Sequence, residues 1–202
     1  MKTTILTAAI ALSAVFGISS SVSAATTTKT ETAIVLTEVK NISEIEVHGN
    51  VQLFLTTDNE DKVKVYNDYY NENALVQEKN GVLRITSYSS EKLVVWVTVS
   101  NLSKLTAFDN AVVKSFGKFS AIDLDVTLHN HALAQLDMDA INASVTLTDR
   151  SRADLSGTAE NGKLEFAGSA FMNAGNFIAA RLTKTVKFQP LRHPHPVQFA
   201  SL

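Results

Sequence analysis

The chain contains no cysteine, and its only three prolines lie within residues 190–196 of 202. Without cysteine there is no disulfide framework, so the chain must gain its stability from packing. Because proline is absent before residue 190, the preceding chain is free to form hydrogen-bonded ladders. Acidic and basic residues number 20 and 18, and this balance argues against the basic surface of a nucleic-acid-binding protein.

The first 24 residues have the pattern of a secretory signal peptide. Lys2 supplies the positive start, residues 5–18 form an apolar run, and Val22-Ser23-Ala24 places small residues where signal peptidase reads them. The apolar run is short for a membrane anchor, and no cysteine follows it that could carry a lipid. The sequence therefore predicts cleavage between Ala24 and Ala25. Export would be to the periplasm, the outer surface or the medium, with no transmembrane segment left in the mature chain.

Threonine, serine, asparagine, aspartate and valine are abundant, as in β-rich chains with polar turns. Residues 42–55 alternate between apolar and polar side chains around Gly49-Asn50, which predicts two strands joined by a tight turn. Further strands are predicted over 62–66, 82–86 and 93–99. No segment has the periodicity of an amphipathic helix.

Four similar stretches follow at nearly constant spacing. Phe108, Leu128, Leu147 and Phe166 lie 20, 19 and 19 residues apart. Such a repeat is too short for a pair of helices and fits one coil of a stacked β-solenoid. Two residues after each of these positions stands a residue type that tolerates a left-handed backbone. The turn column predicted in this way is Asn110, Asn130, Asp149 and Gly168.

Other columns keep the same spacing and alternate between apolar and polar residues, as successive positions of a strand do. One predicted inward column, with a lysine as its exception, is Lys114, Ala134, Ala153 and Met172. The column predicted to face outward is Val113, Leu133, Arg152 and Phe171. An exposed apolar strip marks an interaction site, so this row is the predicted contact surface. In the alternative, the strand over 93–99 with Trp96 covers the row as part of the core.

The order of these elements resembles a known family. Ile45-x-Val-x-Gly-Asn-Val-x-Leu53 is followed by a Lys-Val-x-Val strand, a Gly-x-Leu-x-Ile strand and then the repeats with their turn residues. Over about 42–188 this pattern is similar to the GIN domain, the head domain of auto-transporter adhesins in exported proteins of Gram-negative bacteria. The resemblance implies a right-handed parallel β-solenoid in the periplasm or at the surface, with no established chemistry. The family usually has glycine beside alanine or serine at its turns, whereas only Gly157 and Gly168 lie near them here.

The predicted fold class is all-β, a right-handed parallel β-solenoid with coils of about 19–20 residues, preceded by N-terminal β-strands. The expected division of the chain is a signal peptide at 1–24 and a threonine-rich linker at 25–41, then the GIN-like domain at 42–188 and an irregular tail with proline and histidine at 189–202.

Histidine pairs and carboxylate pairs raise the question of a metal site. His129 and His131 would share one face if their strand continues, but the nearby Arg150 argues against a cation there. The register predicts instead that Asp109 is the ladder neighbour of His129. The pair His193 and His195 lies in the tail and carries less weight.

The aspartates of 123–125 and 137–139 could offer oxygen ligands to Ca²⁺, but the two pairs lie 14 residues apart, out of step with the repeat. Solvated outer faces are the simpler interpretation. We therefore predict no metal, cofactor or catalytic residue.

Two functions are compatible with these features. The leading hypothesis is a secreted or envelope-associated, non-enzymatic β-solenoid that acts as an adhesin-like interaction module for an unknown envelope protein or polysaccharide. The alternative is a carbohydrate-active β-helix enzyme that cleaves acidic polysaccharide, with Arg150 and Arg152 near Asp149 and Asp154 as the basic and acidic groups. No Ser-His-Asp order or glycine-rich phosphate loop supports that alternative. Nucleic acid is not an expected partner, and homo-oligomerisation is left open.

Overall fold

The computed structural model describes residues 33–36, 39–66 and 73–187. The predicted signal peptide, its cleavage site at Ala24 and Ala25, and the tail at 189–202 lie outside the described residues. Within the described part, no helix is long and apolar enough to cross a membrane.

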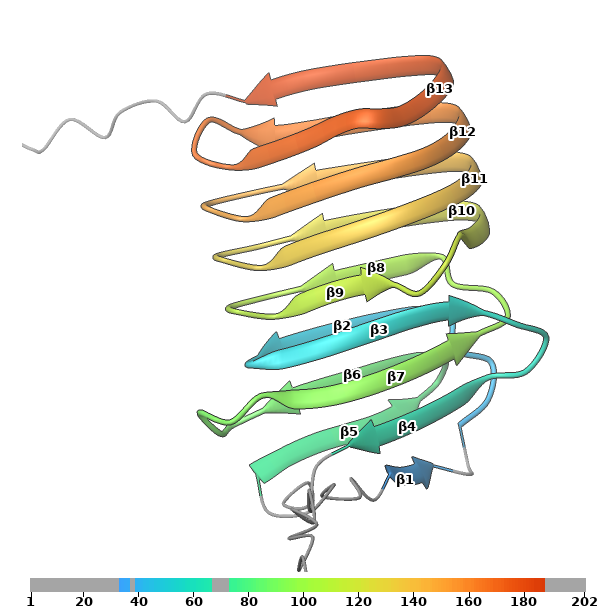
Figure 1. Cartoon of the computed structure of the whole chain (residues 1–202), viewed down its shortest axis with the longest axis vertical. Coiled ribbons are helices and arrows are strands. Elements are labelled where there is room, and N and C mark those ends of the chain that lie inside the picture. The colour runs from blue at the N-terminus through green and yellow to red at the C-terminus, as the bar shows by residue number, and fades with distance from the viewer. Residues whose placement is uncertain (1–32, 37–38, 67–72, 188–202) are drawn as a thin grey trace, which may run out of the picture. The chain divides into compact units, whose positions relative to one another are not determined.

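The described residues form one thirteen-stranded mixed sheet (Figure 1). Its strands are β1 (Ala33–Leu36), β2 (Glu44–Gly49), β3 (Val51–Thr57), β4 (Lys62–Tyr66), β5 (Ala74–Lys79), β6 (Val82–Ser87), β7 (Leu93–Val99), β8 (Lys104–Ala107), β9 (Val112–Ser115), β10 (Phe119–Leu128), β11 (Leu133–Leu147), β12 (Arg152–Ala167) and β13 (Phe171–Lys187). The all-β prediction is confirmed. The sheet is not purely parallel, however, because β4 runs antiparallel to β1 and β7, and β5 runs antiparallel to β6.

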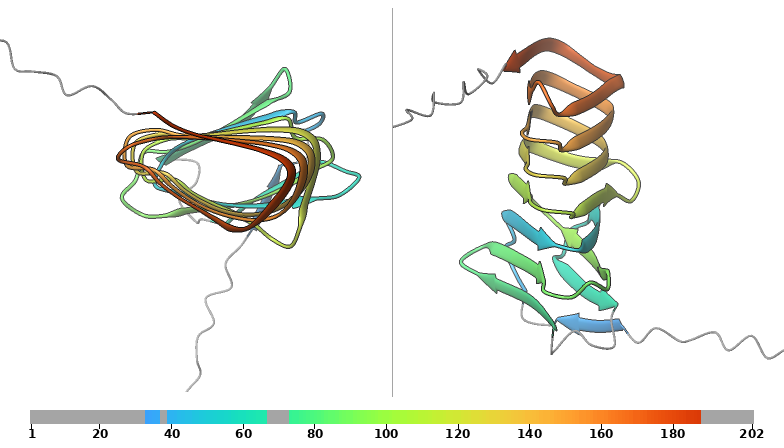
Figure 2. Two further views of the ribbon diagram at one scale, coloured as in Figure 1. Left: turned by 90° about the horizontal axis from the view of Figure 1, so that it is seen from above. Right: turned by 90° about the vertical axis from the view of Figure 1, so that its left-hand side faces the viewer.

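The sheet curls so that two halves face each other across the core (Figure 2). We call face 1 the half built from β1, β4, β7, β3, β9 and the first parts of β11, β12 and β13. Face 2 contains β5, β6, β2, β8, most of β10 and the second parts of the same three long strands. The long strands pass from one face to the other, and a tight turn then returns the chain to face 1.

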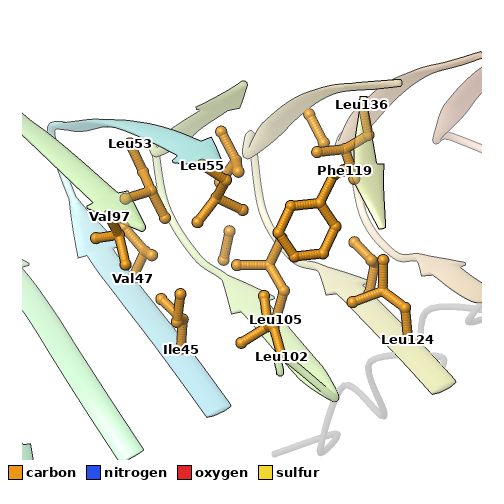
Figure 3. Close-up of a cluster of buried hydrophobic side chains, with 14 of the residues drawn as sticks. Ile45, Val47, Leu53, Leu55, Val97, Leu102, Leu105, Phe119, Leu124 and Leu136 are labelled. Carbon is orange, nitrogen blue, oxygen red and sulfur yellow. The ribbon is translucent and has the colours of Figure 1, made fainter. Parts of the chain in front are cut away.

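Strand alternation fills the space between the faces with apolar side chains. In Figure 3, Leu53, Leu55 and Val97 of face 1 point toward Ile45 and Val47 of face 2. One interior row on face 2 crosses six neighbouring strands, and each member is at most 1% exposed: Leu83, Ile45, Leu105, Val126, Val145 and Leu164. Burial of each such side chain contributes about 1.5–3 kcal/mol, so these rows are the main source of stability.

The N-terminal strands belong to the same stack as the repeats. β2 pairs in parallel with both β6 and β8, and β3 pairs with both β7 and β9. The turn at Gly49-Asn50 therefore joins two strands that lie on opposite faces and do not pair with each other. The N-terminal strands precede the repeats in sequence, but β2 and β3 lie in space between the layer of β6 and β7 and the layer of β8 and β9.

The register of the first repeat differs from the prediction by one residue. Leu128, Leu147 and Phe166 are ladder partners as expected, but on the side of β8 the partner of Leu128 is Ala107, not Phe108. The spacing between the first and second repeats is therefore 21 residues. The cause is an insertion between β9 and β10 around Gly117, whose φ is +77°. After it, pairing of Phe119 with Met138 restores the 19-residue step.

This shift corrects the predicted columns. Lys114 does not interrupt the interior, because the inward column is Val113, Ala134, Ala153 and Met172. Lys114 lies instead on the outer surface, in register with Gln135. The outward column correspondingly begins with Val112 and not with Val113, which is fully buried.

The stack ends at β13, whose second edge pairs with no strand among the described residues. This strand carries Arg181, Lys184 and Lys187 and no acidic residue. Lys184 occupies the position where the preceding strands place Leu164 and Val145 in the interior. Charged residues on an edge oppose edge-to-edge pairing of copies, so we interpret this strand as a protected end of the sheet.

Candidate functional site

The turn column lies at one edge of the stack. Asn130 and Asp149 have φ values of +57°, as predicted. In the first repeat the left-handed residue is Asp109, with φ of +59°, and not Asn110. This difference reflects the one-residue shift in register described above. Gly168 does not have the positive φ expected for it.

The turns surround a hollow of about 470 Å³, in which Asp109, Asn130 and Asp149 are hydrogen-bonded to one another. The Asn130 side-chain amide donates to Asp109 Oδ1 (3.0 Å), and the Asn130 backbone N–H donates to Asp149 Oδ2 (3.1 Å). That backbone hydrogen bond, helped by the Thr148 hydroxyl, holds the pKa of Asp149 below its usual range. Because Asp109, Asn130 and Asp149 satisfy each other, they hold the turns together.

The His-x-His motif lies in the turn between β10 and β11, so strand alternation does not apply to it. The ring of His129 stacks on Phe108 (4.6 Å between centroids), and its Nδ1 lies 2.9 Å from the Thr148 hydroxyl oxygen. The prediction that Asp109 is its ladder neighbour is wrong, because the neighbour in register is Phe108. Among the described residues, no three histidine, aspartate or glutamate side chains are grouped closely enough to hold a metal ion.

A second concavity, of about 570 Å³, follows the outer side of face 2. A hydrogen-bonded chain of four side chains runs along it: Asn142 donates to Asp123 (2.6 Å), Asn161 donates to Asn142 (2.8 Å), and Arg181 donates to Asn161 (3.2 Å). Each group is a ladder neighbour of the next. Asp123, for which a solvated outer face is a simpler interpretation than calcium ligation, is thus hydrogen-bonded to the neighbouring strand.

The outer surface of face 1 carries two continuous ladders of side chains. The first contains the predicted contact row, with Val112 in place of Val113, and extends it across β3, β7 and β4. In spatial order it is Tyr66, Val94, Gln52, Val112, Leu133, Arg152 and Phe171. Phe171 is 60% exposed and Arg152 is exposed, while Leu133 is half-buried.

The alternative in which residues 93–99 cover this row is wrong. β7 is a member of the same sheet, so Trp96 lies beside the row and not over it. The second ladder, adjacent to the first, is Lys64, Trp96, Phe54, Lys114, Gln135, Asp154 and Asn173.

Three aromatic rings gather in and beside the second ladder. Phe54 stacks on Trp96, with 4.5 Å between the ring centroids. Trp96 and Phe116 pack edge to face, with 5.1 Å between the ring centroids. Phe116 is 63% exposed. Sequence reasoning missed this cluster, although alternation with the buried Val95 and Val97 already indicated that Trp96 faces outward.

Lysines surround the aromatic cluster. A hollow of about 250 Å³ is lined by Lys62, Lys64, Tyr66, Trp96 and Thr98. Lys62 is paired with Glu60 (2.9 Å), which raises the pKa of this lysine above its usual range. Neither Lys64 nor Lys114 forms an ion pair with any described residue. Unpaired cations and aromatic rings thus lie close together on this part of the described surface.

The comparisons with known proteins agree with the fold. A family described as "Putative auto-transporter adhesin, head GIN domain" matches residues 41–187. A solved structure of a "putative adhesin" from Bacteroides fragilis is 16% identical with a TM-score of 0.63, and covers 78% of each chain. A "putative lipid binding protein" from Parabacteroides distasonis is 11% identical with a TM-score of 0.60, covering 77% of this chain and 78% of that one. A "putative adhesin" from Parabacteroides merdae is 12% identical with a TM-score of 0.59 and covers 78% of each chain. No curated protein matches.

Proposed function

Because the chain belongs to the family of auto-transporter adhesin head GIN domains, we propose that it is an exported, non-enzymatic interaction module of the cell envelope or surface. In this proposal the signal peptide directs export, and the parallel repeats with their 19-residue step form a right-handed β-solenoid that displays a binding surface. The solved structures named as putative adhesins share the fold of this chain.

The observation that carries the proposal is the outer surface of face 1. Its first ladder places apolar side chains of several strands in one row, and its second ladder places aromatic rings beside that row. Phe116 and Phe171 remain mostly exposed, and no described segment covers them. Aromatic residues and arginine are enriched at interfaces, and a contiguous exposed apolar strip is unusual on a surface without a partner.

The enzyme alternative has less support from the geometry. Arg150 and Asp149 line the hollow at the turns, whereas Arg152 and Asp154 lie on the outer surface of face 1. Asp154 accepts a hydrogen bond from the Asn173 amide (3.1 Å). The basic and acidic groups invoked for catalysis are thus divided between two places, and a general acid and base must converge on one bond.

We predict that Leu133→Asp combined with Phe171→Asp abolishes binding of the purified domain to an envelope fraction of the bacterium that encodes it. Two carboxylates in the first ladder would have to lose their water on contact, which costs several kcal/mol in total. Pelleting with the envelope fraction measures binding, sedimentation of the free protein measures self-association, and circular dichroism checks the fold.

The matched control is Ser144→Asp combined with Thr183→Asp. It adds the same charge on face 2, where both positions are ladder neighbours of Lys163. The control should bind like the unmodified domain. Equal loss in both double variants would mean that the effect is not specific to face 1, and unchanged binding of the face 1 variant would reject the contact surface.

A further inference from the structure

We propose that the hollow beside Trp96 is a binding site for the acidic sugar residues of a polysaccharide. The hollow itself supplies Trp96 and the unpaired Lys64. The rings of Phe54 and Phe116 and the unpaired Lys114 lie beside it and complete the proposed site. The inference rests on the proposed function and specifies the ligand of the same surface.

The rings provide a platform for the apolar side of a sugar. The face of an aromatic ring is electron-rich and attracts polarised C–H groups, such as those on the face of a pyranose. Phe54 and Trp96 are stacked at 4.5 Å and half-buried, so their orientation is fixed before a ligand arrives. Phe116, just after the end of β9, extends the platform on the side away from the first ladder. A preordered platform reduces the entropy lost on binding.

The lysines supply the selectivity for an anion. Lys64 is the ladder neighbour of Trp96, and Lys114 is the ladder neighbour of Phe54, so a cation stands at each end of the stacked pair. The nearest carboxylate along the second ladder is Asp154, two strands beyond Lys114. At about 4.8 Å per strand, that separation is close to the screening length of about 8 Å at physiological salt. The ammonium group of Lys114 is therefore largely uncompensated, and the ammonium group of Lys64 forms no ion pair with any described residue.

The surrounding charge also favours a specific anion over a general attraction to polyanions. The whole chain has a net charge of −2, so a polyanion gains nothing from the protein's overall field. Attraction is confined to the lysines beside the rings. On face 2, by contrast, the polar groups of the large concavity already bind one another in the chain from Asp123 to Arg181.

The test uses the fluorescence of Trp96, the only tryptophan of the chain. The purified domain is titrated with polygalacturonate and with alginate, and in parallel with neutral dextran and single-stranded oligothymidylate. The proposal predicts a saturable change with an acidic polysaccharide that weakens as salt is added, and no such change with dextran or oligothymidylate. Lys64→Gln combined with Lys114→Gln should lower the affinity about tenfold or more, since two charge-assisted hydrogen bonds are lost.

The control is Lys79→Gln combined with Lys163→Gln, which removes the same charge from face 2 and should leave the affinity unchanged. The proposal is overturned if neither acidic polysaccharide changes the fluorescence, if dextran or oligothymidylate binds equally well, or if both double variants lose affinity equally. If any of these outcomes occurs while Leu133→Asp with Phe171→Asp still abolishes envelope binding, the proposed function as an interaction module is retained and only the proposed ligand is rejected. Circular dichroism of both lysine variants separates lost binding from lost folding.

Discussion

Replacing Gly157 by alanine is expected to lower the free energy of unfolding by more than about 3 kcal/mol. Gly157 has a φ of +100°, where an L-residue is strained, and it lies in β12 between Met138 and Phe177 of the neighbouring strands. A Cβ at this position would collide with the Met138 carbonyl oxygen and would lie 2.8 Å from the Met138 nitrogen. Both are backbone atoms, so relief requires separation of two paired strands. Urea unfolding followed by circular dichroism measures the loss.

Gly117→Ala is the matched control for this substitution. Gly117 also has a positive φ of +77°, but an added Cβ would meet no heavy atom within 4 Å. Only the backbone strain remains, which costs about 1–2 kcal/mol. If both substitutions cost the same, the close approach of β11 and β12 at Gly157 is not as described.

Leu105→Ala is expected to cost about 2–5 kcal/mol. Leu105 is 1% exposed and lies in the middle of the interior row of face 2, between Ile45 and Val126. The cavity would be closed on both sides by strands held in register, so the surrounding side chains could collapse only partly. The midpoint of urea unfolding should fall, while the slope of the transition stays unchanged.

Leu182→Ala removes the same atoms from the last strand. Leu182 lies in line with the buried Leu124 and Ala143, but it is 49% exposed because no described strand covers it. Its loss should cost roughly 1 kcal/mol, in proportion to the smaller area buried. A cost equal to that of Leu105→Ala would mean that β13 is covered in solution.

Alternation and spacing predicted most of the strands and the register of the later repeats. They missed β5 and also β1, which lies in the segment predicted to be a linker. Leu128, Leu147 and Phe166 pair as their 19-residue spacing indicates. The error in the first repeat arose because a left-handed turn tolerates aspartate as well as asparagine. Asp109 and Asn110 were therefore equally acceptable turn residues, and the insertion around Gly117 has no signal in the columns themselves.

The order of the N-terminal strands could not be predicted, for a different physical reason. An inward-facing row of valine, leucine and isoleucine packs equally well against any neighbour of the same kind. The sequences of β2 and β3 therefore do not indicate that they lie between two later layers. The aromatic cluster depends on that order, because Phe54 meets Trp96 only when β3 is placed next to β7.

The most direct test of the contact surface uses the absence of cysteine from the chain. Gln135→Cys places a single thiol on the outer surface of face 1, and Thr183→Cys places one on face 2, both at exposed positions. The rate of labelling by a water-soluble maleimide is measured for each, with and without a saturating amount of the envelope fraction. We predict that the envelope fraction slows labelling at Gln135→Cys severalfold and leaves Thr183→Cys unchanged. Equal protection of both thiols, or protection of Thr183→Cys alone, would contradict the assignment of face 1 as the binding surface.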